Sequence, residues 1–196
     1  MRLGRRNLIW WSVAALVFTA AVSYAAYRPA RLRNFGVVKD DVLLRSGQLT
    51  PNGLKRALQE GRIKSVVTLR PVRDQESNPD TWEEELCKAH GVNYFRCSPG
   101  EGSGEEGLNR MAEGFLAVMD DPANHPVLVH CLAGRDRTGT MCAIYRMEFD
   151  RWPSARAAEE MQRFEFDPNK DPAAKAYERY VLGYLPRRDR KATENK

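Results

Sequence analysis

The chain has 196 residues, 42% of them hydrophobic and 29% charged, which is enough for one domain with a substantial core but not for two. The excess positive charge, +5 overall, is divided between the first 33 residues and a short basic run over 187–191. We expect no nucleic-acid partner, because such basic ends suit a membrane surface and no alternation of aromatic and basic residues indicates base stacking. No metal is expected either, since the four cysteines and three histidines lack the spacing of ligands.

Residues 8–27 carry no charge and follow three arginines near the N-terminus. As a helix these 20 residues would span about 30 Å at roughly 1.5 Å per residue, the thickness of a bilayer core. We therefore expect an N-terminal hydrophobic helix over 8–27, within a signal-anchor or transmembrane segment over 1–27 that makes the protein a single-pass membrane protein. Export after cleavage of a signal peptide is the alternative, because Ser23-Tyr24-Ala25 has small residues at the spacing of a cleavage site.

After a linker over 28–34, alternating elements indicate one domain over 35–186, followed by a basic polar tail over 187–196. Short β-branched and apolar runs predict strands at 35–38, 42–45, 65–69, 92–97 and 126–129. Helical patterns predict helices at 51–60, 80–90, 108–119, 140–147, 154–164 and 172–185, the first of them capped by Thr50. Strands that alternate with helices predict an α/β fold, a three-layer domain with a central, mostly parallel sheet flanked by helices.

The most informative segment is HCLAGRDRTG over 130–139, which we term the cysteine loop. It connects a predicted buried strand to a predicted helix, a geometry that points backbone N–H groups at an anion. Cys131 precedes Arg137 by six positions, with Gly134 between them to let the loop curl. The helix N-terminus, the loop amides and the arginine all favour the thiolate form of the cysteine. The planar fork of Arg137 can also bind two oxygens of a phosphate.

Together these groups predict covalent phosphoryl transfer that needs no cofactor. Cys131 attacks phosphorus, and water hydrolyses the resulting thiophosphate. Thr138 donates its hydroxyl to the thiolate, and His130 orients the loop. The phosphate oxygens are bound by Arg137 and by the loop backbone at Leu132, Ala133, Gly134 and Arg135.

These residues resemble the cysteine-dependent protein phosphatase superfamily, in particular the dual-specificity and atypical tyrosine phosphatases. The resemblance is carried by VLVHCLAGRDRTG over 127–139, by LLRSGQ over 43–48 and by the VVTLR strand over 66–70. It implies that Cys131 is the nucleophile, that Arg137 binds phosphate and that the Thr138 hydroxyl lies beside the thiolate. It also implies a phosphatase domain over 35–186.

The implied substrate is a protein that carries phosphotyrosine, with phosphoserine or phosphothreonine as a further substrate. A phosphoinositide or inositol phosphate is the alternative, because Arg135 stands where phosphoinositide phosphatases of the superfamily often carry lysine. An alternative of another class is a non-catalytic phosphate-binding module held at the membrane. Intact Cys131, Arg137 and Thr138 argue against it.

The general acid is the one departure from the family pattern. Such enzymes usually carry an aspartate some 30 residues before the cysteine, and this chain has none between Asp80 and Asp120. We expect Asp136 to act as the acid, as the aspartate beside the arginine is thought to do in myotubularin-like phosphatases. Glu101, Glu105 and Glu106 in the glycine-rich segment are the alternatives, and an Asp136 salt bridge that braces the loop is the structural alternative.

Overall fold

The computed structural model describes residues 33–60, 62–71, 81–100 and 104–194, together with Leu16, Val17 and Thr19. In this part of the chain no helix is both long enough and apolar enough to cross a bilayer. The hydrophobic helix expected over 8–27 and most of the linker expected after it lie outside the described residues, apart from Leu16, Val17 and Thr19 within the helix.

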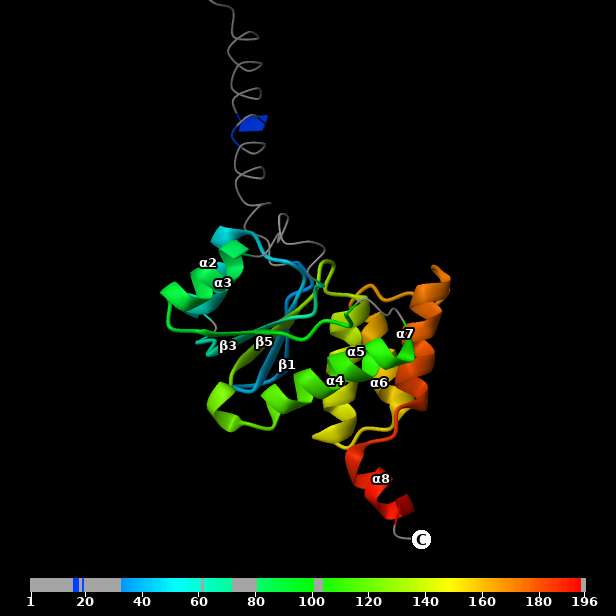
Figure 1. Cartoon of the computed structure of the whole chain (residues 1–196). Helices are drawn as coiled ribbons and strands as arrows, with labels where there is room; N and C mark the ends of the chain where they lie inside the picture. The colour runs from blue at the N-terminus through cyan, green and yellow to red at the C-terminus, as the bar shows by residue number, and fades with distance from the viewer. Residues whose placement is uncertain are drawn as a thin grey trace, which may run out of the picture. The chain divides into compact units, whose positions relative to one another are not determined.

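A five-stranded, mostly parallel sheet forms the centre of the domain, as the sequence predicts (Figure 1). Its strands lie in the order β1-β2-β5-β3-β4, with β1 antiparallel to β2 and every other pair parallel. The strands are β1 (Gly36–Lys39), β2 (Leu43–Ser46), β3 (Ser65–Thr68), β4 (Asn93–Arg96) and β5 (Val127–His130).

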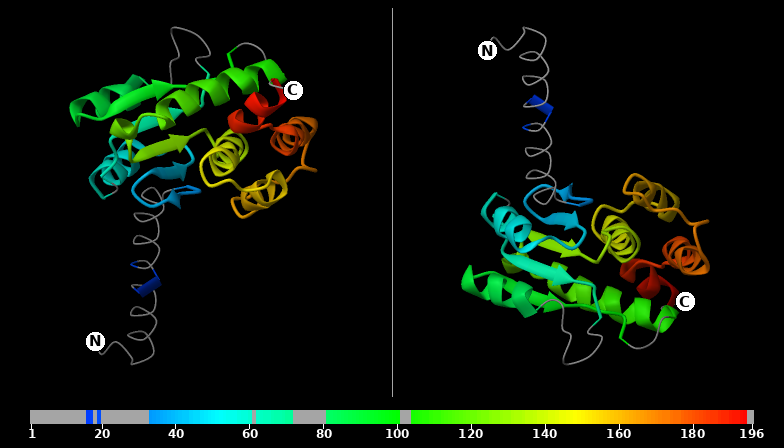
Figure 2. Two further views of the ribbon diagram at one scale, coloured as in Figure 1. Left: turned by 90° about the horizontal axis from the view of Figure 1, so that it is seen from below. Right: turned by 90° about the horizontal axis from the view of Figure 1, so that it is seen from above.

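Helices cover both faces of the sheet and complete the predicted three layers (Figures 1 and 2). One face is covered by α2 (Pro51–Glu60) and α3 (Thr81–Ala89). The other is covered by α4 (Glu105–Met119), α5 (Asp136–Glu148), α6 (Ser154–Gln162) and α7 (Pro172–Gly183). A 3₁₀ turn, η2 (Pro122–Asn124), precedes β5, and a helix that the sequence did not indicate, α8 (Arg187–Glu194), lies within the basic segment after 186.

The alternation of side chains along the strands creates two apolar clusters, one on each face of the sheet. Val67 and Val129 belong to the larger cluster beneath α4 and α5. Val66 and Leu128 belong to the smaller cluster beneath α2 and α3. Because β3 and β5 are buried on both faces, they need apolar residues at consecutive positions, which is the pattern that predicts them as strands.

The three inner strands end at one edge of the sheet. Ser46 at the end of β2 and Thr68 at the end of β3 both pair with His130 at the end of β5. The carboxyl ends of parallel strands are where ligands bind in open α/β sheets. The fold therefore places the cysteine loop, which begins at His130, at the edge where a binding site is expected.

Candidate active site

The cysteine loop lies between β5 and α5, and its second half belongs to the helix. Helix α5 begins at Asp136, four residues before the predicted start, so Arg137 and Thr138 lie in its first turn. The first N–H groups of a helix have no partner within the helix and carry a partial positive charge. The start of α5 therefore presents donors to any anion bound above Cys131.

The loop backbone is held with its carbonyl oxygens turned toward the surrounding scaffold. Four of them accept hydrogen bonds: His130 from the Leu69 N–H (2.8 Å), Leu132 from the Gln48 N–H (3.0 Å), Ala133 from the Asn34 side chain (2.8 Å) and Gly134 from Arg45 (2.6 Å). In a planar trans peptide the N–H of the next residue points the opposite way. The loop N–H groups are thus directed inward, and that of Gly134 donates to the Cys131 sulfur at 3.3 Å.

Only glycine fits at position 134. Its φ is +71°, in the left-handed region, and a Cβ there would lie 2.5 Å from the backbone nitrogen of Gly47. The loop therefore curls at Gly134, and the close approach of the segment that follows β2 leaves no room for a side chain there.

Buried polar atoms without a hydrogen-bond partner gather around this loop. Among the described residues these side-chain atoms all belong to the end of β2 or to the loop: Arg45 Nε, Ser46 Oγ, Arg135 Nε, Arg137 Nε and Thr138 Oγ1. His130 Nε2 is also buried at this place, but it lies 3.2 Å from the Glu83 carboxylate. Buried polar groups normally have partners, so such a cluster indicates a ligand that supplies them. Most of these atoms are donors, which indicates an anion.

A buried glutamate that the sequence did not indicate lies behind the loop. Glu83 of α3 is 1% exposed, and its Oε1 lies 3.2 Å from His130 Nε2. The same carboxylate accepts hydrogen bonds from Gln48 (3.0 Å) and from the Tyr94 hydroxyl (3.1 Å). His130 Nδ1 in turn lies 3.4 Å from the Cys131 carbonyl. His130 therefore connects the buried Glu83 carboxylate to the backbone of the cysteine loop.

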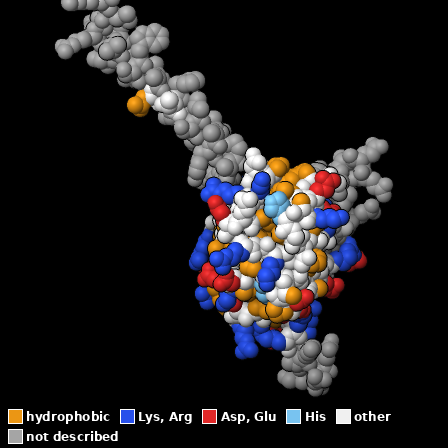
Figure 3. All heavy atoms as spheres, turned by 90° about the vertical axis from the view of Figure 1, so that its left-hand side faces the viewer, with side chains coloured by type: hydrophobic (Ala, Val, Ile, Leu, Met, Phe, Trp, Pro, Cys, Tyr) orange, Lys and Arg blue, Asp and Glu red, His pale blue; other side chains and the backbone are white. Residues whose placement is uncertain are grey.

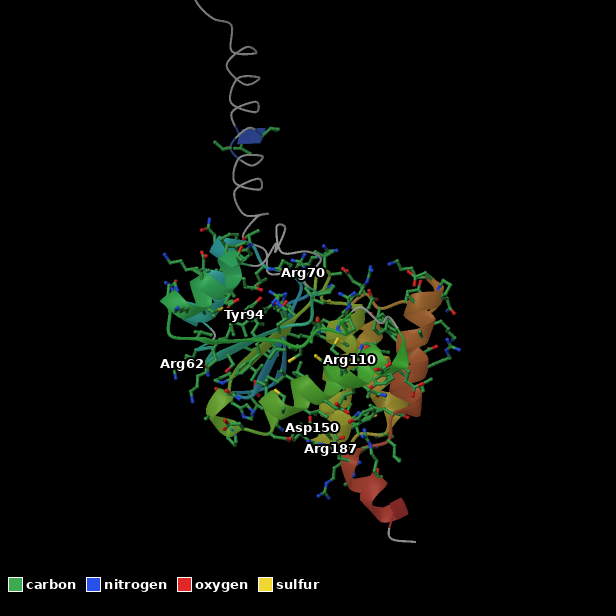
Figure 4. All side chains as sticks on the ribbon, in the orientation of Figure 1. Arg62, Arg70, Tyr94, Arg110, Asp150 and Arg187 are labelled. Carbon is green, nitrogen blue, oxygen red and sulfur yellow. The ribbon has the colours of Figure 1, made fainter. Side chains whose placement is uncertain are left out.

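Two arginines extend this network toward the edge of the site. Arg70 donates to the Gln48 side chain (2.8 Å), and Arg96 donates to the Tyr94 hydroxyl (3.2 Å) and to the Arg70 carbonyl (3.0 Å). Figure 4 shows Arg70 at the end of the molecule where the inner strands terminate, with Tyr94 on the same side. Positive charge is thus present beside the loop as well as within it.

The candidate acids occupy different surroundings. Asp136, the first residue of α5, is partly exposed, and its Oδ1 lies 3.6 Å from Arg135 Nε, within ion-pair distance but beyond hydrogen-bond distance. Glu106 is exposed and forms an ion pair with Arg110 at 2.6 Å. Glu105 is exposed in the first turn of α4, a helix that begins three residues before its predicted start. Glu101 lies outside the described residues.

A separate cleft of about 960 Å³ lies between α4 and α7 and is lined by Leu108, Glu113, Tyr180 and Arg187, among others. None of its lining residues belongs to the cysteine loop, and it contains no cysteine. The cysteine loop, where Cys131 and the anion-binding groups lie together, is therefore the candidate active site.

A cysteine and an arginine on a loop between a central parallel strand and a helix define the fold and site of cysteine-based phosphatases. This chain belongs to the tyrosine phosphatase family, whose model matches residues 29–184. The predicted resemblance is confirmed.

Individual relatives agree with this family. Inositol diphosphatase DSP4 of Arabidopsis thaliana is 32% identical over 142 residues, which cover 67% of this chain but 63% of that protein, less than two thirds of its length. Two solved structures share the fold. The core of PP-IP phosphatase SIW14 of Saccharomyces cerevisiae, bound to citrate, has a TM-score of 0.61 at 21% identity and covers 84% of this chain and 93% of that one. TpbA of Pseudomonas aeruginosa, bound to phosphotyrosine, has a TM-score of 0.60 at 22% identity and covers 86% and 93%.

Proposed function

We propose that this chain is a phosphatase that hydrolyses inositol phosphates, with a diphosphate group as the preferred target, through a cysteinyl-phosphate intermediate on Cys131. The observation that carries the proposal is the set of unpartnered buried polar atoms around that cysteine, together with the inward N–H groups of the loop. A phosphoryl group supplies acceptors for these donors.

The reaction follows from the positions of these groups. The Cys131 sulfur attacks phosphorus in line, an S–P bond forms and the P–O bond to the leaving group breaks. Arg137 and the loop N–H groups bind the three equatorial oxygens, while Asp136 gives its proton to the leaving oxygen. Water then attacks phosphorus, the S–P bond breaks, and Asp136 regains a proton from that water as phosphate departs. Thr138 stabilises the thiolate that is released.

A diphosphate target agrees with the missing upstream aspartate. A phosphate leaving group has a pKa of about 6, compared with about 10 for a phenol and far more for an alkyl alcohol. Protonation of the leaving group is therefore least necessary for a diphosphate. The relative from Arabidopsis thaliana is named an inositol diphosphatase, and Arg70, Arg96 and Arg135 supply the positive charge that a multiply phosphorylated ring requires. These points favour the inositol phosphate over the phosphotyrosine protein that the loop sequence first indicates.

Phosphotyrosine remains the second candidate, because one residue of the loop is apolar and exposed. Leu132 follows the nucleophile directly and is 59% exposed. An exposed leucine beside an anion site offers contact to an aromatic ring but nothing to a second phosphate. TpbA, which shares the fold, was crystallised with phosphotyrosine.

A phosphate-release assay separates the candidates. The full chain is given an inositol pyrophosphate, a monophosphorylated inositol, a phosphoinositide in mixed micelles and a phosphotyrosyl peptide. We expect the highest kcat/KM for the pyrophosphate and no release by Cys131→Ser on any substrate. Preference for the peptide overturns the substrate class, and release by the Cys131→Ser variant overturns the mechanism. Tight binding of these ligands without turnover by the wild-type chain identifies a binding module instead.

We further propose that residues 8–27 anchor the chain in a membrane, since these 20 uncharged residues match the thickness of a bilayer core. Carbonate extraction of membranes from cells that produce the full chain tests this anchor. Retention in the pellet with an intact N-terminus is expected. Release into the supernatant, or a mature N-terminus shortly after Ala25, overturns the anchor, and the second result supports a cleaved signal.

A further inference from the structure

Arg45 is the largest fully buried side chain of the described domain, and it lies directly beneath the cysteine loop. It belongs to β2 and pairs with Val129, so its side chain points to the face covered by α4 and α5. It is 1% exposed. Its Nη2 donates to the Gly134 carbonyl at 2.6 Å, and its guanidinium carbon lies 3.7 Å from the centre of the Phe164 ring.

The buried charge of Arg45 lacks the counter-ion that buried arginines usually have. Among the described residues no carboxylate lies within ion-pair distance of it, and its Nε has no hydrogen-bond partner. Arg146 shows the usual arrangement: it also stacks on an aromatic ring, that of Trp152, but it forms ion pairs with Asp150 and Glu160. An uncompensated buried charge is costly, because neither a carbonyl nor an aromatic face replaces the lost hydration.

The geometry of the loop indicates which anion can balance the buried charge of Arg45. Arg45 and the Cys131 sulfur lie on opposite sides of Gly134: the arginine holds its carbonyl, and its N–H donates to the sulfur. Because the peptide from Gly134 to Arg135 is planar and trans, the held carbonyl turns the Arg135 N–H inward. Burial raises the pKa of the nearby Cys142 thiol to about 11, and the charge of Arg45 opposes this rise.

We propose that Arg45 is a positioning residue of the cysteine loop: it turns the Arg135 N–H into the site, and its buried charge balances the Cys131 thiolate and the phosphoryl group bound there. The second half of this statement rests on the proposed function. Arg45 does not touch the substrate, so its effect reaches the reaction through the loop and through the field of its charge. Among the described residues, the charged or titratable groups of the loop and of the elements packed against it include His130 with Glu83 behind it, Arg135, Asp136, Arg137 and Cys142.

The test uses Arg45→Met, which keeps much of the volume but removes the charge, and Arg45→Lys, which keeps the charge but removes the fork. Alkylation of Cys131 by iodoacetamide is followed from pH 4 to 9 by mass spectrometry, and kcat/KM is measured on para-nitrophenyl phosphate. For Arg45→Met we expect the alkylation midpoint to rise by about one pH unit, which is roughly tenfold less thiolate on the acidic side, and kcat/KM to fall at least 100-fold. For Arg45→Lys we expect a midpoint near that of wild type and a smaller loss of kcat/KM.

Arg146→Met is the matched control, because it removes a second ring-stacked arginine, one that is largely buried and lies far along α5 from the loop. We expect it to lower the melting temperature and leave the alkylation midpoint unchanged. An unchanged midpoint in Arg45→Met overturns the proposal. If Arg45→Met does not fold, Arg45→Lys provides the test. An alkylation midpoint of Arg45→Lys that is as high as that of the unfolded chain overturns the proposal. Failure of the wild-type chain to hydrolyse any phosphate, together with a raised midpoint in Arg45→Met, would disprove the proposed function and leave this role of Arg45 intact.

Discussion

The Nε2 atom of His130 lies 3.2 Å from Oε1 of Glu83, with both side chains almost wholly buried. Burial by itself raises the pKa of Glu83, but the contact with His130 and the hydrogen bonds from Tyr94 and Gln48 outweigh it and hold the pKa below its usual 4.5. The glutamate is therefore ionised at neutral pH. It fixes the imidazole, which in turn lies against the Cys131 carbonyl.

Glu83→Gln is expected to weaken the domain in a pH-dependent way. Because the folded-state pKa is lowered, the glutamate contributes stability that is complete above about pH 4.5 and is lost as the pH falls through the folded value. Wild type and variant should therefore differ by about 1–3 kcal/mol at pH 7 and converge in acid. Urea unfolding between pH 3 and 8 measures this difference. Glu84→Gln, on the exposed side of the same helix, is the control, and a pH-independent difference would contradict the prediction.

Gly134→Ala is expected to disable the loop. The substitution puts a side chain at a positive φ and within 2.5 Å of the Gly47 backbone, so either the loop or the segment after β2 must move. We expect a loss of about 2–3 kcal/mol of stability and of at least 100-fold in kcat/KM. Differential scanning calorimetry and an aryl phosphate assay measure the two effects. Gly183→Ala, where a Cβ meets open space, should leave both unchanged.

The order of elements and the position of the loop could be predicted from the sequence because their signals are local. The Thr50 cap is one example: its hydroxyl accepts from the Gly53 N–H at 3.1 Å, as the residue types indicate. Buried strands such as β3 and β5 appear in the sequence as apolar runs. The cysteine loop is recognised by the six positions from Cys131 to Arg137. The helix predicted over 140–147 begins too late. The first turn of α5, Asp136-Arg137-Thr138, is polar, so in the sequence it resembles a loop.

The groups that support the loop could not be predicted, because their contacts are made between elements distant in sequence. Three consecutive glutamates, Glu83, Glu84 and Glu85, open α3, and only the packing of that helix shows that the first is buried while the other two are exposed. Arg45 likewise reads as a solvated strand residue. A charged side chain at an inward position of a strand is the one signal that could have identified it.

Asp136→Asn tests the general acid. If Asp136 protonates the leaving group, the variant should lose at least 100-fold on an alkyl phosphate and less than about fivefold on an aryl phosphate with a good leaving group or on a diphosphate. The ratio of kcat/KM values on these substrates, in wild type and variant, provides the measurement. Equal losses of kcat/KM on all three kinds of substrate would show that Asp136 is not the acid. Its role would then be to hold Arg135, whose Nε lies 3.6 Å from the Asp136 carboxylate. Glu106→Gln, in an exposed ion pair, is the control.

Arg187 is expected to contribute stability without affecting the reaction. At the start of α8 it binds Asp120 at 2.6 Å and Glu148 at 3.2 Å, at the end of the molecule opposite Arg70 (Figure 4). Hydrogen bonding to Arg187 lowers the pKa of Asp120. Burial raises the pKa of Glu148, but hydrogen bonds from Tyr184 and Arg187 outweigh it and the pKa is lowered.

The space-filling view in Figure 3 shows another face, where basic and acidic side chains are interspersed, as on an ordinary solvated surface.

Arg187→Ala should therefore lower the free energy of unfolding by about 1 kcal/mol at pH 7, a modest value because the pairs are partly exposed. Both carboxyl groups have lowered pKa values, so the effect should be complete above about pH 4.5 and fade as the pH falls below it. A double-mutant cycle with Asp120→Asn isolates the pair, and we expect the two changes to be less than additive. The kcat/KM should match that of wild type, since α8 is remote from the cysteine loop. Full additivity at pH 7 would show that Asp120 and Arg187 act independently, and would leave the contact of Arg187 with Glu148 and the hydrogen bond from Arg188 to the Met147 carbonyl to hold α8 to the domain.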